Sequence, residues 1–147
     1  MIKALFFDID GTLVSFETHA IPASTIEALE DVHKKGIKIF IATGRPKAII
    51  NNLSVLQTRG LIDGYITMNG AYCFVGNNVI YKSAIPKEEV QALAEICQQN
   101  DYPCIFVGEH TISVCQPNQL VREIFYDFLH VNEIPVKSFE EATQGEI

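Results

Sequence analysis

The stretch Ala4-Leu-Phe-Phe-Asp-Ile-Asp-Gly-Thr-Leu13 decides the fold. Its apolar run, from Ala4 to Phe7, predicts a buried strand that ends at two carboxylates one residue apart, Asp8 and Asp10. In an open parallel sheet, ligands bind just beyond the carboxyl ends of the strands. Two acids placed there repel each other, so we expect a cation or a shared proton. With a divalent ion, one carboxylate can act as a nucleophile and the other as an acid or base.

Residues 1–67 alternate apolar strands with amphipathic helices. Strands are expected at residues 4–7, 37–42 and 64–68, with helices at 21–35 and 46–57 between them. A strand that repeatedly follows a helix in this way predicts an α/β fold with a parallel sheet and right-handed crossovers.

The pattern changes after the third strand. Gly76-Asn77-Asn78 is a hairpin turn signal between two short apolar runs. Beyond it, helices and short strands alternate without the earlier order, which predicts an α+β module. We therefore divide the chain into two domains, residues 1–85 and 86–147. The expected elements of the second are a helix at 86–99, strands at 104–107 and 111–115, and a helix at 117–130.

Composition excludes several classes of protein. Among 147 residues, 48% are hydrophobic and 20% charged, which is typical of a folded globular chain. A net charge of −7 argues against a nucleic-acid partner, because phosphate backbones require clustered Lys and Arg. No apolar run approaches the ~20 residues of a membrane span. We expect a cytoplasmic protein with no membrane partner, whose four cysteines are reduced thiols.

A second candidate site follows the second strand, at Thr43-Gly44-Arg45. A hydroxyl group, together with amides at the N-terminus of the helix expected to begin at Pro46, would bind an anion. Arg45 either contacts a substrate or pairs with an acid, and the sequence favours neither role.

Asp8-Ile-Asp-Gly-Thr12 closely resembles motif I, Asp-x-Asp-x-Thr, of the haloacid dehalogenase-like (HAD) phosphotransferases. The resemblance implies a Mg²⁺-dependent phosphatase. In such an enzyme Asp8 attacks phosphorus and forms an aspartyl-phosphate, while Asp10 protonates the leaving oxygen and then activates water. The resemblance also implies that Mg²⁺ is bound by a carboxylate oxygen of Asp8 and the main-chain carbonyl of Asp10.

Two further stretches extend the resemblance. Thr43-Gly44-Arg45 is similar to motif II, which implies that Thr43, Gly44 and Arg45 bind phosphate or substrate. Thr67-Met68-Asn69-Gly70-Ala71 resembles the Asn-Gly-Ala signature of the Cof-type subfamily, and adds Asn69 to that set. The implied fold is part of a HAD-type Rossmann-like core followed by the beginning of an inserted α+β cap. The implied substrate is a small phosphorylated metabolite such as a sugar phosphate.

The chain departs from the family beyond residue 85. Motif III supplies a Lys, and motif IV reads Gly-Asp-x-x-x-Asp, yet the only Asp residues in this part of the chain are Asp101 and Asp127, and neither follows a glycine. We therefore expect an incomplete fragment with little or no activity by itself. Strand 4–7 then lies at the edge of the sheet, and an apolar edge favours self-association.

Three alternatives remain open. These are a non-catalytic, phosphate-binding remnant, a phosphohexomutase-like member of the superfamily, and a receiver-like phosphoacceptor domain. The acceptor of the last class ends the third strand, whereas strand 64–68 ends without an acid. None of these patterns names an individual substrate.

Overall fold

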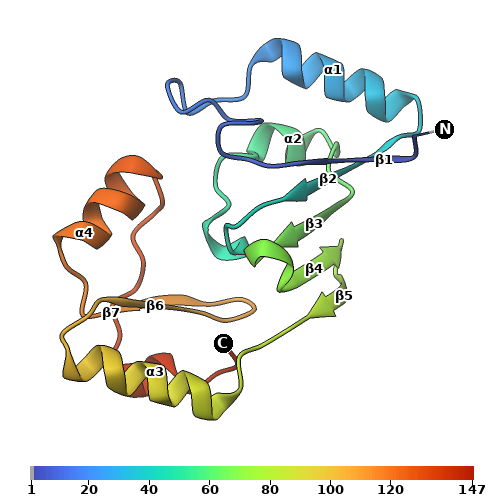
Figure 1. Cartoon of the computed structure of the whole chain (residues 1–147). Helices are drawn as coiled ribbons and strands as arrows, with labels where there is room; N and C mark the ends of the chain where they lie inside the picture. Colours follow the sequence, from blue (N-terminus) through green and yellow to red (C-terminus); the bar gives the residue numbers. More distant parts are fainter. Residues whose placement is uncertain (1) are drawn as a thin grey trace. The chain divides into compact units, whose positions relative to one another are not determined.

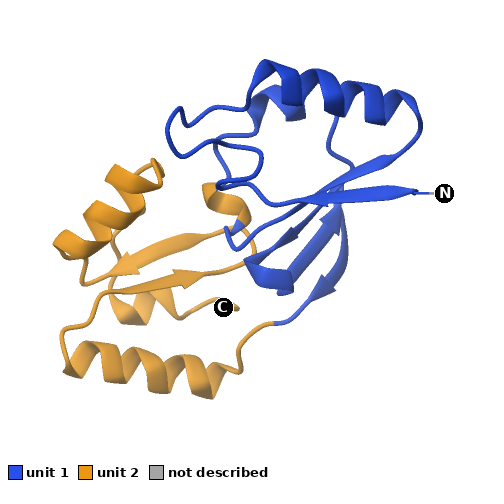
Figure 2. Cartoon of the chain, turned by 45° about the horizontal axis from the view of Figure 1, so that its top comes forward, with its two compact units in different colours: residues 1–46, 50–83 blue, residues 47–49, 84–147 orange. Residues whose placement is uncertain are grey.

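The computed structural model describes residues 2–147, which form two compact units (Figures 1 and 2). The first unit runs to Pro46 and resumes at Ile50–Ser83, and the second contains Lys47–Ile49 and Ala84–Ile147. Within the described part of the chain, no helix is long and apolar enough to cross a membrane.

The first unit is built on a five-stranded sheet with the strand order β1-β2-β3-β4-β5. The first three strands are parallel, and the last two are added as antiparallel neighbours. The α/β prediction is therefore confirmed, and the strand positions agree with it closely. The strands are β1 (Ala4–Phe7), β2 (Lys38–Ala42), β3 (Gly64–Thr67), β4 (Tyr72–Val75) and β5 (Asn78–Lys82).

The two helices of the first unit, α1 (Ala23–Lys34) and α2 (Ser54–Thr58), lie on the same side of the sheet (Figure 1). Ile39 and Ile41 of β2 are fully buried on this side, in one cluster with Leu29 of α1 and Leu56 of α2. Alternate residues of a strand point to opposite faces, which explains how β2 can hold a core on one face and aromatic rings on the other.

On the opposite face, the ring of Phe40 stacks on Phe6 of β1 with centroids 4.9 Å apart. The Phe6 side chain is nevertheless 57% exposed. Because β1 is the terminal strand of the sheet, an exposed aromatic residue lies on an unprotected edge.

The prediction of a single helix at residues 46–57 is wrong. The structure forms a short 3₁₀ turn, η1 (Lys47–Ile49), then an irregular stretch, then α2. Asn51 and Asn52 occupy that stretch, and Asn side chains compete with helical backbone bonds. No α-helix begins at Pro46, so the helix N-terminus proposed for anion binding is absent from the described residues.

The second unit is a two-stranded antiparallel hairpin between helices. One face of the hairpin packs on Val90 and Ala94 of α3, and the other packs on Val121 of α4. The helix predicted at 117–130 is confirmed in extent, but its second part is a π-helix, which the sequence did not predict. The elements are α3 (Lys87–Gln99), β6 (Cys104–Val107), β7 (Ile112–Cys115), α4 (Gln119–Val121), the π-helix η3 (Arg122–Phe128) and α5 (Phe139–Ala142).

Candidate functional site

Asp8 and Thr43 follow the carboxyl ends of two paired parallel strands. Phe7 of β1 is the register partner of Ile41 in β2, so the residues after each strand reach the same edge of the sheet. Asp8 is exposed, whereas Thr43 is only 5% exposed. Within residues 2–147, no group pairs with the Asp8 carboxylate, which leaves it free to meet a ligand at the ligand-binding edge.

A tight turn carries the chain from Asp8 to Asp10. The Ile9 carbonyl accepts hydrogen bonds from the N–H groups of Leu13 (3.0 Å) and Val14 (2.9 Å), and Ile9 itself is fully buried. Gly11 adopts φ +77°, and a Cβ there would lie 2.6 Å from a ring carbon of Phe16. The turn thus requires glycine, and it redirects the second carboxylate away from the strand.

That second carboxylate meets Arg45 in a two-point ion pair. The Arg45 Nε donates to Asp10 Oδ2 at 2.7 Å, and Nη2 donates to Oδ1 at 2.8 Å. The arginine side chain is 7% exposed and the aspartate 25%. Of the two roles left open for Arg45 by the sequence, the structure shows pairing with an acid. A bidentate, charge-assisted pair fixes the orientation of both groups.

The loop from Thr43 to Arg45 is held by short-range bonds. The Arg45 N–H donates to Thr43 Oγ1 at 3.1 Å, and the Thr43 N–H donates to the Ile66 carbonyl of β3 at 2.9 Å. Because Thr43 Oγ1 accepts from Arg45, the hydroxyl proton is available for another acceptor. Anion binding here depends on this hydroxyl group and the loop rather than on a helix.

Asn69 lies over the same loop. Its N–H donates to the Thr43 carbonyl at 3.2 Å, and Met68 and Asn69 both adopt the left-handed conformation, at φ +51° and +53°. A Cβ on Gly44 would lie 3.3 Å from the Asn69 carboxamide oxygen. The Asn-Gly-Ala signature pointed to Asn69, but no sequence signal indicated its approach to Gly44, because the two residues are distant in the chain.

The residues fit a Mg²⁺ site in part. Carboxylate and carbonyl oxygens are the ligands that Mg²⁺ prefers. Arg45 occupies both carboxylate oxygens of Asp10, which leaves the Asp8 carboxylate and the Asp10 main-chain carbonyl as the candidate ligands. Among residues 2–147, no group of three or more His, Cys, Asp or Glu side chains is placed to hold a metal ion. The described residues therefore supply two candidate ligands for Mg²⁺, the Asp8 carboxylate and the Asp10 main-chain carbonyl.

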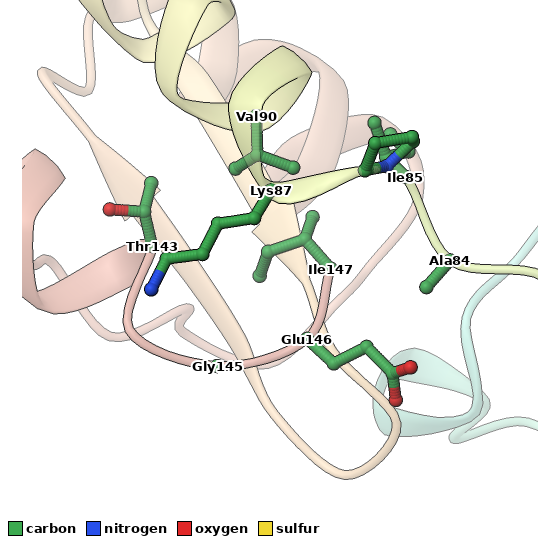
Figure 3. Close-up of a pocket in the computed structure, with 9 residues that line it drawn as sticks. Ala84, Ile85, Lys87, Val90, Thr143, Gly145, Glu146 and Ile147 are labelled. Atoms are coloured by element: carbon green, nitrogen blue, oxygen red, sulfur yellow. The ribbon is translucent and has the colours of Figure 1, made fainter.

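The second unit contains a cavity of about 460 Å³ (Figure 3). The Ile85 N–H donates to the Ile147 carbonyl at its wall, and the charged residues that line it are Lys87 and Glu146. A single acid and a single exposed lysine do not form a catalytic constellation, and we assign the cavity no role.

The sequence profile of the haloacid dehalogenase-like hydrolases matches residues 5–145. The chain belongs to this family. The resemblance stated on Asp8–Thr12 is therefore confirmed, and the sheet of the first unit is that of a HAD-like hydrolase core. The roles of individual residues are not settled by this match and remain predictions.

Three similar proteins place the chain more closely. A solved structure of the HAD subclass IIB sugar phosphatase BT4131 is 77% identical, with a TM-score of 0.90, and the match covers 98% of this chain and 55% of that one. YkrA of Bacillus subtilis is 32% identical over 110 residues, or 75% of this chain and 41% of YkrA. The phosphoglycolate phosphatase of Metallosphaera sedula is 31% identical over 98 residues, or 65% of this chain and 43% of that enzyme. The chain thus spans about half the length of these relatives.

The Asp10–Arg45 pair makes a testable contribution to stability. Replacing Arg45 with Ala leaves a mostly buried carboxylate without its partner, and should lower the free energy of unfolding by about 2 kcal/mol. Urea denaturation at one fixed protein concentration measures the change. Arg59→Ala is the control, because Arg59 pairs with Glu30 at an exposed site and should cost less than about 1 kcal/mol. Equal effects of the two substitutions would contradict the importance of the Asp10 pair.

The approach of Asn69 to Gly44 is tested by a double-mutant cycle. Gly44→Ala should cost about 1 kcal/mol, because its Cβ crowds the Asn69 carboxamide. In an Asn69→Gly background that cost should largely disappear, since glycine tolerates φ +53° and leaves room for the methyl group. Gly145→Ala, which meets no atom within 4 Å, should be neutral. Additive effects of the substitutions at 44 and 69 would show that the two residues do not interact.

Proposed function

We propose that the whole protein is a Mg²⁺-dependent phosphatase of the Cof type that acts on small phosphorylated metabolites, sugar phosphates among them. The observation that carries this proposal is the meeting of an exposed Asp8, the Asp10–Arg45 pair and the Thr43 hydroxyl at one edge of the sheet. The 77% identity to the sugar phosphatase BT4131 supports the choice of substrate class.

Asp8 is the proposed nucleophile. Its carboxylate is exposed at the end of β1, and within residues 2–147 it has no partner to displace before it attacks phosphorus. Attack forms an aspartyl-phosphate on Asp8, and water then hydrolyses this intermediate. Splitting one difficult displacement into two steps is the general advantage of a covalent route.

Asp10 is the proposed acid and base, and Arg45 holds it in place. The two parallel hydrogen bonds from the guanidinium restrict rotation of the Asp10 carboxylate. For the first step Asp10 must carry a proton on one oxygen, which weakens the hydrogen bond of that oxygen with Arg45. Asp10 gives this proton to the leaving oxygen and takes one back from the attacking water in the second step. Arg45 is therefore a positioning residue for Asp10.

Thr43 and Asn69 are the proposed phosphate ligands beside the nucleophile. The Thr43 hydroxyl can donate to a phosphoryl oxygen while its own oxygen accepts from the Arg45 N–H. Gly44 allows the Asn69 carboxamide to approach the loop, because a Cβ at position 44 would lie 3.3 Å from the Asn69 carboxamide oxygen. When bound by Asp8 and the Asp10 carbonyl, Mg²⁺ would offset the repulsion between the nucleophile and the phosphoryl oxygens.

The nucleophile is tested by Asp8→Asn in the whole protein. An amide cannot form the acyl-phosphate, so phosphate release should fall by on the order of 10³-fold or more. The assay measures phosphate release from hexose phosphates and p-nitrophenyl phosphate with Mg²⁺. Phosphate release by the unaltered protein should also stop when Mg²⁺ is chelated. Asp101→Asn is the matched control, because Asp101 is exposed in the second unit at φ +56°, which Asn tolerates. Wild-type turnover by the Asp8 variant would refute the role of Asp8 as the nucleophile, whereas no turnover by the unaltered whole protein would favour the non-catalytic alternative.

We also propose that the 147-residue chain self-associates through β1. Its outer edge carries unpaired backbone groups beside the exposed Phe6, and a second copy can satisfy them. Light scattering at micromolar concentration should show dimers or larger species, and Phe6→Lys should shift them toward monomers by placing a charge on the edge. Leu120→Lys, at a comparably exposed site in the second unit, should leave association unchanged. A monodisperse unaltered monomer would contradict the proposal.

A further inference from the structure

Three cysteines gather on one face of the hairpin in the second unit. Cys104 and Cys115 are register partners on β6 and β7. Cys115 is fully buried in a cluster with Val90 and Ala94 of α3, and Cys104 packs against the same cluster. Cys97 follows Ala94 by one helical turn and thus shares its face of α3. The three thiols therefore belong to one small region, separate from the first unit that contains Asp8.

The turn after α3 brings Cys97 and Cys104 together. The Asn100 N–H and its side-chain Nδ2 both donate to the Ile96 carbonyl, at 3.2 and 2.8 Å. The Tyr102 N–H donates to the Cys97 carbonyl at 2.9 Å. These bonds reverse the chain immediately beyond the helix, so that the first residue of β6 returns to the last turn of α3. The Cys97 side chain neighbours Cys104 and contributes to the raised pKa of its thiol.

The register of the hairpin argues against a disulfide bond between Cys104 and Cys115. The Gly108 N–H donates to the Thr111 carbonyl at 2.9 Å, and pairs of this kind recur at every second position along an antiparallel ladder. Cys104 and Cys115 fall on such a hydrogen-bonded pair. Cβ atoms there lie about 5.5 Å apart, whereas a disulfide needs about 3.5–4.5 Å. Cys97 is the better partner of Cys104.

We propose that Cys97 and Cys104 form a reversible disulfide when the protein meets a low-molecular-weight disulfide such as oxidised glutathione. Both side chains are half-buried and thus partly open to solvent, unlike Cys115. Among the described residues, no group of three or more His, Cys, Asp or Glu side chains is placed to hold a metal ion.

The reaction consists of two thiol–disulfide exchange steps. The Cys97 thiol loses its proton, its sulfur attacks one sulfur of oxidised glutathione, and the first glutathione thiolate leaves and takes up a proton. The Cys104 thiol then loses its proton and attacks the Cys97 sulfur, which expels the second glutathione in the same way. Two protein thiols are oxidised by two electrons, and one glutathione disulfide is reduced to two glutathione molecules.

The surroundings make this exchange slow at neutral pH. Burial, followed by the interaction with neighbouring Cys97, raises the pKa of Cys104 to about 12. Cys115, which faces the pair from β7, also has a raised pKa, mainly through burial, with Glu141 and Lys137 nearby. Since the thiolate is the attacking species, the bond should form faster at alkaline pH than at neutral pH.

Peptide mapping of the 147-residue chain tests the proposal. The native chain is incubated with oxidised glutathione, quenched with acid, alkylated and analysed by mass spectrometry without reduction. The expected product has lost two hydrogens, carries a Cys97–Cys104 crosslink and reverts with dithiothreitol. Stable glutathione adducts without a crosslink, or a crosslink that involves Cys73 or Cys115 as often as this pair, would overturn the proposal.

Substitutions and a second reagent sharpen the test. Cys97→Ser should abolish the crosslink, whereas Cys73→Ser, in the first unit, should leave it intact. Phenylarsine oxide, which condenses with two neighbouring thiols with loss of one water, requires no substitution. It should protect Cys97 and Cys104 of the unaltered chain from later alkylation. If it protects neither, the two thiols are not neighbours and the proposal fails.

Discussion

The parallel pairing of β1 with β2 is the constraint on which the rest of the first unit depends. It aligns Phe7 with Ile41 and so brings the residues after each strand to one edge of the sheet. This register brings Asp8, Thr43 and the turn that carries Asp10 to the same edge of the sheet. A shift of one residue would move Ile39 and Ile41 out of the core, so the same apolar pattern that stabilises the unit also fixes the site.

The ion pair between Asp10 and Arg45 joins the two loops that extend beyond those strands. Hydrogen bonds within each loop also stabilise it. The Ile9 carbonyl accepts them in the first loop, and the Thr43 hydroxyl accepts one in the second. The β3–β4 turn adds a third support through Asn69. A carboxylate held in this way needs little reorganisation when a substrate arrives, which is the physical basis of electrostatic preorganisation.

The sequence predicted those features that depend on local composition and spacing. The apolar run before Asp8 sufficed for β1, and Thr43-Gly44-Arg45 marked the second strand end. The sequence-based prediction failed where tertiary contacts determine the local structure. The Asn51-Asn52 pair breaks the helix predicted at residues 46–57, and Ile49 packs with residues of the second unit instead. The choice between the two roles of Arg45 stayed open because its partner lies 35 residues away. Nothing in the sequence indicated the π-helix at Arg122–Phe128.

The central claim is that phosphoryl transfer proceeds through a covalent intermediate on Asp8. Borohydride reduces an acyl-phosphate to an alcohol, which would convert the phosphorylated aspartate to homoserine. The whole protein is therefore mixed with a hexose phosphate and Mg²⁺, quenched with borohydride and mapped by mass spectrometry. The account predicts homoserine at position 8, and only when substrate is present. Homoserine at another aspartate, or its absence during steady phosphate release, would contradict it.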